Sequence, residues 1–260
     1  MRRILAAALL ALSAAPLLAE PQARPVSWDF DGTTYAGAIV HDPAARGPLP
    51  GIVMVPNWMG VNESAIEKAR AVAARGYVVL LADMYGEGLR PANAREASAA
   101  AGAVYADREH MRGRINAALD ALRAEAPNAG VDTQRLGAIG FCFGGATVLE
   151  LARSGTAIGG VVSFHGGLGT DLPAEAGVVA TPMLVLNGAD DPLVSADEIA
   201  GFQDEMTAAG ADWQFVNFAG AVHCFAEADA DSGDACQYHE RSANRAYRMM
   251  DGFFAEVFAD

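Results

Sequence analysis

LGAIGFCFGGATVLEL, residues 136–151, joins an apolar run to a second run with helical spacing. The first run predicts a buried strand ending at Phe141, and the second predicts a helix from Phe143. Cys142 stands at the turn between them, in the pattern Gly-x-Cys-x-Gly-Gly. Glycines allow the backbone to close around a nucleophile, and the N-terminus of the following helix stabilises a thiolate. The stretch thus predicts a reactive cysteine, although a buried free cysteine also packs as a small hydrophobe.

Strand and helix patterns alternate along the rest of the chain. An Asp-Gly pair at 31–32 predicts a hairpin, and two apolar runs around a helical segment predict a β-α-β unit. The expected strands are 49–56, 77–83, 135–141, 159–165, 182–188 and 212–218, and the expected helices are 63–76, about 92–125, from 143, 196–209 and from about 239. This order predicts the α/β class, with a mostly parallel central sheet flanked by helices on both faces. We expect one domain over residues 20–260, without a large cap domain.

The first nineteen residues have the layout of a secretory signal peptide. Arg2 and Arg3 precede an apolar stretch through Leu12, and small residues follow it. Cleavage is expected after Ala19, with Ala15 as the second candidate, and the alternative is an uncleaved anchor. The sequence therefore predicts a periplasmic or secreted protein that does not remain in the membrane after cleavage.

Composition limits the possible partners. Hydrophobic residues make up 52% of the chain, enough for one sizeable core, and the formal net charge of −14 becomes −16 once Arg2 and Arg3 are removed. Nucleic acid requires clustered Lys and Arg, so it is not an expected partner. A small molecule is the expected partner, and the protein is expected to be a monomer or a homodimer.

The three cysteines of the chain suggest one disulfide and one free thiol. In an oxidising compartment, Cys224 and Cys236 are expected to pair and to leave Cys142 free. A metal site formed by Cys224, Cys236 and His239 is an alternative, but its spacing matches no familiar zinc motif. We expect no metal and no cofactor.

A catalytic thiol needs a base and an acid that orients the base. In sheets of this kind the three residues follow the order nucleophile, acid, histidine. Asp191 and His223 follow later strands, in NGADDPLV and GAVHCF. Asp190 is the alternative acid. His165, in SFHGG, precedes the acids, so it is expected to line the pocket or to donate or accept a hydrogen bond there.

These motifs resemble those of the dienelactone hydrolase family of α/β-hydrolases. The resemblance covers nearly the whole mature chain and rests on GFCFGG, NGADDPLV and GAVHCF, with ARGYVVLLADMYG and ANRAYRMMDGFF as further similar segments. It implies hydrolysis of an ester, lactone or thioester by Cys142, His223 and Asp191. It also implies an oxyanion hole formed by the backbone N–H groups of Phe143 and Trp58.

The chain departs from the family pattern around the pocket. The family's prototype has a glutamate where this chain has Asn57, and arginines that bind a substrate carboxylate where this chain has Glu87 and Glu227. Like charge repels a carboxylate, so dienelactone itself is expected to be a poor substrate. Alternatively, both acids are simply exposed. Tyr85 is a further candidate for the pocket.

Two other functions are alternatives for this sequence. A non-catalytic binding protein can keep this fold, because a fold alone does not establish chemistry. A peptidase of the same fold usually has a serine nucleophile and an extra gating domain, and neither is visible here. The complete set of candidate catalytic residues favours the hydrolase.

Overall fold

The computed structural model describes residues 20–259, so the expected signal peptide lies outside the described residues. One sheet of eight strands has the order β1-β2-β4-β3-β5-β6-β7-β8. The strands are β1 Gln22–Phe30, β2 Thr33–His41, β3 Leu49–Val55, β4 Val78–Leu81, β5 Val131–Phe141, β6 Gly160–Phe164, β7 Met183–Gly188 and β8 Trp213–Phe218. The strands from β3 to β8 pair in parallel, and only the β1–β2 and β2–β4 pairs are antiparallel.

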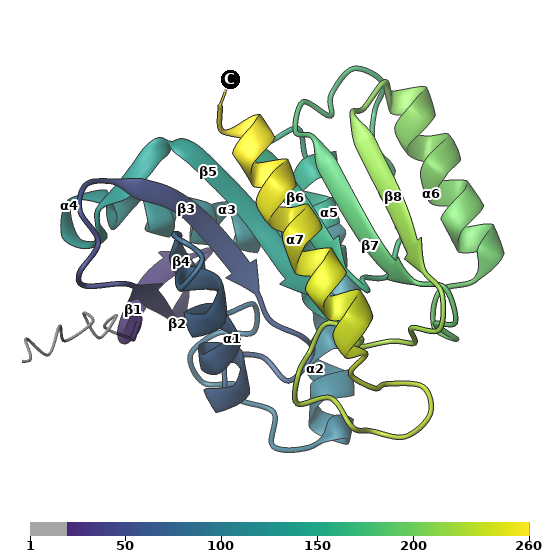
Figure 1. Cartoon of the computed structure of the whole chain (residues 1–260), viewed down its shortest axis with the longest axis horizontal. Coiled ribbons are helices and arrows are strands. Elements are labelled where there is room, and N and C mark those ends of the chain that lie inside the picture. The colour runs from purple at the N-terminus through teal and green to yellow at the C-terminus, as the bar shows by residue number, and fades with distance from the viewer. Residues whose placement is uncertain (1–19, 260) are drawn as a thin grey trace, which may run out of the picture.

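Helices cover both faces of this sheet, as expected from the sequence (Figure 1). They are α1 Glu63–Ala73, α2 Ala94–Tyr105, α3 Arg108–Ala124, α4 Ala126–Ala129, α5 Phe143–Arg153, α6 Ala196–Ala209 and α7 Glu240–Val257. Apolar residues of α1 and α7 pack on one face, and those of α2, α3, α5 and α6 pack on the other. Alternate residues of the central strands point into these two cores; Ile52 and Val53 of β3 are an example.

Local sequence explains most of these boundaries. Asp31 and Gly32 both have positive φ, at 47° and 71°, as a two-residue hairpin turn requires. The single helical region expected near 92–125 is instead two helices, α2 and α3. Asp107 starts the second one, since its side chain accepts a hydrogen bond from the backbone N–H of His110.

No cap domain stands apart from this sheet within residues 20–259. In the connection between β4 and β5, α2 buries Ala97, Ala101 and Val104 and so packs as part of the body. Among the same residues, no helix combines the length and the hydropathy needed to cross a bilayer. The parallel order of β5, β7 and β8 directs their following loops to one edge of the sheet.

Candidate active site

Cys142 occupies the turn between β5 and α5 in a conformation that is rare for a residue with a side chain. Its φ is 54° and its ψ is −114°. The neighbouring glycines explain how the turn fits. A Cβ on Gly140 would lie 2.0 Å from the carbonyl oxygen of Gly144, and a Cβ on Gly144 would lie 2.1 Å from the carbonyl oxygen of Val55. Only glycine fits at these two positions, so the Gly-x-Cys-x-Gly pattern is required by backbone contact.

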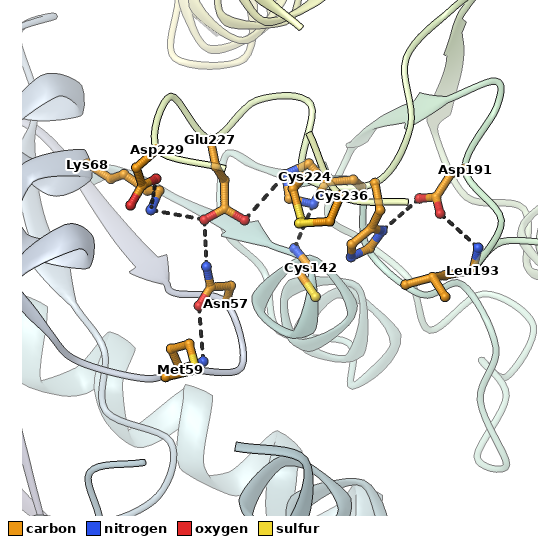
Figure 2. Close-up of a disulfide and its surroundings, with 12 residues drawn as sticks. Asn57, Met59, Lys68, Cys142, Asp191, Leu193, Cys224, Glu227, Asp229 and Cys236 are labelled. Atoms are coloured by element: carbon orange, nitrogen blue, oxygen red, sulfur yellow. Dashed lines mark hydrogen bonds and ion pairs between the residues drawn. A yellow bond between two sulfur atoms is a disulfide. The ribbon is translucent and has the colours of Figure 1, made fainter. Parts of the chain in front are cut away.

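Asp191 and His223 meet at the same edge of the sheet. The Oδ2 atom of Asp191 lies 2.7 Å from Nδ1 of His223, while its Oδ1 atom accepts a hydrogen bond from the N–H of Leu193 at 2.9 Å. Both side chains are buried, whereas Asp190 is exposed. The structure therefore places Asp191 against the histidine and not its neighbour. Figure 2 shows this acid on one side of Cys142 and Glu227 on the other.

The second ring nitrogen of His223 is free to act on a thiol. Nε2 is buried and has no hydrogen-bond partner among residues 20–259. Burial lowers the pKa of His223, but its interactions with Asp191 and Cys142 outweigh burial and raise the pKa to about 10. The imidazole of His223 is thus protonated at neutral pH.

The contribution of Cys142 to this raised pKa predicts a change in titration when the thiol is removed. In Cys142→Ala the pKa of His223 should fall below its wild-type value, because the interaction with Cys142 that raises it is absent. An NMR titration of the imidazole in both proteins measures the difference. If His223 titrates at the same pH in both, Cys142 and His223 are not electrostatically coupled.

A pocket of about 520 Å³ opens above these residues. Its lining includes the expected site residues Cys142, His223, Trp58, Asn57 and Glu227. The other lining residues are Met59, Asn62, Ser64, Ala94, Leu193, Cys224, Asp229, Ala230, Ser232 and Cys236. Trp58 is 37% exposed to solvent. Phe143, the other expected donor of an oxyanion hydrogen bond, is the first residue of α5.

Two residues expected at the pocket lie behind it. His165 is fully buried, and its Nδ1 accepts a hydrogen bond from the backbone N–H of Cys142 at 3.2 Å. It is thus a hydrogen-bond partner, one of its two expected roles. The hydroxyl of Tyr85 donates to the carbonyl of Trp58 at 2.8 Å, and its ring packs near Phe143. Tyr85 therefore supports the pocket wall from outside.

Glu87 and Glu227 were both expected at the pocket, but only Glu227 lines it. Glu87 is exposed and does not line the pocket, because the chain turns at Gly86 toward β2, where the Glu87 N–H donates to the carbonyl of Thr34. Glu227 lines the pocket but is buried, so the alternative that both acids are exposed is wrong for Glu227. Lys68 of α1 lies 3.0 Å from its Oε2 and balances its charge.

Sequence patterns did not identify Lys68 as part of the site. It lies on a helix of mixed charge, and its partner Glu227 is far away in the chain, so no local signal indicates the contact. Arg90 does not line the pocket: its guanidinium is held by the buried carboxylate of Asp83 and by three backbone carbonyls.

The expected disulfide is present. Cys224 and Cys236 are bonded to one another, and Cys142 is free. The bonded sulfurs do not offer thiolates to a metal, which removes the basis for the site considered with His239. Among residues 20–259, no group of three His, Cys, Asp or Glu side chains is positioned to hold a metal ion. The disulfide closes the segment from Cys224 to Cys236, which begins directly after His223.

A cysteine at a strained turn after a central strand, with an acid and a histidine after later strands, is the arrangement of an α/β-hydrolase. The comparisons narrow this class. The chain belongs to the dienelactone hydrolase family, whose model matches residues 36–258. It is therefore an enzyme that acts on ester or lactone bonds.

The chain is also similar to individual proteins with dienelactone hydrolase names or related names. The protein named "Putative carboxymethylenebutenolidase" from Salmonella typhimurium is 27% identical over 221 residues, which cover 82% of this chain and 79% of that one. The solved structure of m3DLH is 36% identical with a TM-score of 0.84, and covers 92% of this chain and 99% of its own. P91, a dienelactone hydrolase-like promiscuous phosphotriesterase from metagenomic libraries, is 38% identical with a TM-score of 0.83 and the same coverage.

Proposed function

We propose that this hydrolase cleaves uncharged esters, lactones or thioesters through an acyl-cysteine intermediate. Cys142 is the nucleophile, His223 transfers the protons, and Asp191 orients the imidazole. The observation that carries the proposal is the 2.7 Å contact between Asp191 and Nδ1 of His223, which fixes the ring and leaves Nε2 for the thiol and the leaving group.

The first half-reaction forms a bond from sulfur to carbon. The Cys142 thiolate attacks the carbonyl carbon, and the resulting oxyanion accepts hydrogen bonds from the N–H groups of Phe143 and Trp58. Collapse of this intermediate breaks the bond to the leaving oxygen or sulfur, which takes the proton from Nε2 of His223. From an ester or thioester an alcohol or thiol leaves, whereas the hydroxyl of an opened lactone stays attached to the acyl group; in each case the acyl group remains on Cys142.

The second half-reaction returns the enzyme to its starting state. His223, now neutral, takes a proton from water at Nε2 while the oxygen of that water attacks the acyl-cysteine carbonyl. Collapse releases the carboxylic acid and restores the thiolate beside the imidazolium. In comparable enzymes, removing one oxyanion donor lowers the rate about 10²- to 10³-fold. The loop that carries Trp58 is therefore expected to contribute as much to the rate as the base His223.

The substrate preference follows from the charges around the pocket. Among the described residues that line it, none is an arginine, and the nearby Lys68 is already paired with Glu227 and Asp229. We therefore expect kcat/KM for a neutral p-nitrophenyl ester to exceed that for an ester of the same length with a terminal carboxylate by about tenfold or more. Steady-state assays of both esters, with and without reductant, measure this ratio. A clear preference for the anionic ester would contradict the proposed substrate class, and no turnover of any ester, lactone or thioester would contradict the function.

A second candidate activity is hydrolysis of phosphotriesters. The 38% identity to P91, which is described as a promiscuous phosphotriesterase, favours this candidate. A phosphotriester is uncharged, and a thiolate can attack its phosphorus as it attacks a carbonyl carbon. We expect slow release of p-nitrophenol from paraoxon that is lost in Cys142→Ala. Release at the same rate from both proteins would assign that reaction to another part of the chain.

A periplasmic or secreted location is part of the proposal. The leader-like residues 1–19 support it, and so does the Cys224–Cys236 disulfide, since such bonds persist in oxidising compartments. The mass of the exported protein should correspond to a chain beginning at Glu20 or Pro16. Recovery of the full-length chain from the cytoplasm alone would contradict this location.

A further inference from the structure

Glu227 is a buried acid that the proposed chemistry does not use. Its side chain is 3% exposed in the wall of the pocket. Its Oε2 atom accepts a hydrogen bond from Nδ2 of Asn57 at 2.6 Å and lies 3.0 Å from Nζ of Lys68. Its Oε1 atom is buried without a hydrogen-bond partner among residues 20–259 and faces Nε2 of His165 at 3.9 Å. One carboxylate thus touches three different parts of the site.

The first of these parts is the backbone of the nucleophile. The N–H of Cys142 is shared between the carbonyl of Phe164 and Nδ1 of His165. Burial and the neighbouring His223 lower the pKa of His165 well below 6.5, so its ring is neutral. Because Nδ1 accepts a hydrogen bond, the single ring proton belongs on Nε2, which points toward Glu227. The carboxylate therefore favours the tautomer that supports the strained turn at Cys142.

The second part is the loop after β3 that carries Trp58. Asn57 uses its amide group in both directions: Nδ2 donates to Glu227, and Oδ1 accepts from the N–H of Met59 at 3.0 Å. Its backbone carbonyl also accepts from the N–H of Gly60 at 2.9 Å. These contacts enclose Trp58 in a fixed turn. Because one of the two hydrogen bonds that hold the Asn57 amide goes to Glu227, the direction of the Trp58 N–H depends on that acid.

The third part is α1, which fixes the position of the carboxylate itself. Lys68 pairs with Glu227 and also with Asp229, and it donates to Ser64 at 2.6 Å. On the loop side, the backbone N–H of Glu227 donates to the carbonyl of Cys224, whose sulfur is in the disulfide. The acid is thus fixed from the helix and from the loop that carries His223.

We propose that Glu227 is a positioning residue that aligns the two halves of the site, Cys142 through His165 and the oxyanion N–H of Trp58 through Asn57. This inference rests on the proposed function, in which these groups attack the carbonyl and hold the oxyanion. The acid does not touch the reacting atoms. It sets their geometry, so its loss should slow the chemical step more than it weakens substrate binding.

The test is Glu227→Gln, which keeps the size of the side chain and removes its charge. We expect kcat for p-nitrophenyl acetate to fall about 10- to 100-fold, as for a displacement of about 1 Å at a reacting centre, with KM changed by less than about threefold. Asn57→Ala should lower kcat in the same way. In the double variant kcat should fall little further than in the more impaired single variant, because both substitutions weaken the same contact between Asn57 and Glu227.

Glu205→Gln is the matched control. Glu205 is also a mostly buried acid, paired with Arg153 at 2.8 Å, but it belongs to α6 and lies against the C-terminal end of α5, away from Cys142. We expect kcat of this variant to stay within about twofold of wild type, whatever its effect on melting temperature. A fall in melting temperature of Glu227→Gln without a fall in kcat per titrated thiol would make Glu227 purely structural and overturn the inference.

An NMR measurement separates this inference from the proposed function. The ¹⁵N shifts of His165 should report a neutral ring protonated on Nε2 in the wild type, and a mixture of tautomers in Glu227→Gln. If the wild type hydrolyses esters through Cys142 but Glu227→Gln matches it in kcat and in these shifts, only the inference fails. If the wild type has no esterase activity, the proposed function fails and the positioning role of Glu227 fails with it, while the shifts still show whether this acid sets the tautomer of His165.

Discussion

Cys142→Ala is expected to hydrolyse p-nitrophenyl acetate at least about 10⁴-fold more slowly than the wild type, because loss of a nucleophile removes the covalent path and leaves only oxyanion stabilisation. The fold should tolerate the change. Cys142 is only half-buried, and an alanine side chain meets fewer atoms at this turn than a thiol does. Initial rates of both proteins, each checked for an intact disulfide by mass spectrometry, give the ratio.

Thiol labelling supplies an independent control. The chain has three cysteines and two of them are joined, so one equivalent of iodoacetamide should modify Cys142 and stop turnover in the wild type. The same treatment should leave Cys142→Ala unlabelled. Equal hydrolysis by the wild type and the variant would reject Cys142 as the nucleophile.

Asp191→Asn is expected to lower kcat by about 10³ to 10⁴, the size of the effect when the orienting acid of such a triad becomes an amide. An amide at this position can donate to Nδ1 and so favours the wrong tautomer of His223. It also removes the charge that stabilises the imidazolium. Stopped-flow or steady-state assays over a range of substrate concentrations should show the loss in kcat.

Asp190→Asn is the matched control for this prediction. Asp190 precedes Asp191 in the same loop, carries the same charge and is exposed. Its backbone N–H donates to the carbonyl of Ala221, a bond that the substitution retains. We expect kcat within about twofold of wild type. The reverse result, with activity lost in Asp190→Asn and kept in Asp191→Asn, would identify Asp190 as the acid.

Most of the fold could be predicted because its signals are local. Buried parallel strands appear as short apolar runs, and the Asp-Gly pair at 31–32 specifies a hairpin turn. The division of the 92–125 region into two helices was missed, although Asp107 is a usual N-cap residue. Helical propensity on both sides of that position conceals the break, since alanine-rich sequence favours helix throughout.

The site could be predicted only as far as its motifs reach. The turn at Cys142 and the order of acid and histidine have recognisable patterns, and the parallel topology brings their loops to one edge. The environment of Glu227 has no such pattern. Asn57 and Lys68 are distant from it in the chain, and the burial of an acid depends on partners that only the folded structure brings together.

The covalent intermediate at Cys142 is central to the proposed reaction, and peptide mass mapping tests it most directly. The wild-type enzyme would be mixed with p-nitrophenyl acetate, quenched in acid during turnover and digested. One acetyl group is expected on the peptide that contains Cys142, and it should be absent after pretreatment with iodoacetamide. Continued turnover with the acetyl group on another residue, or with no acylated peptide at all, would contradict it.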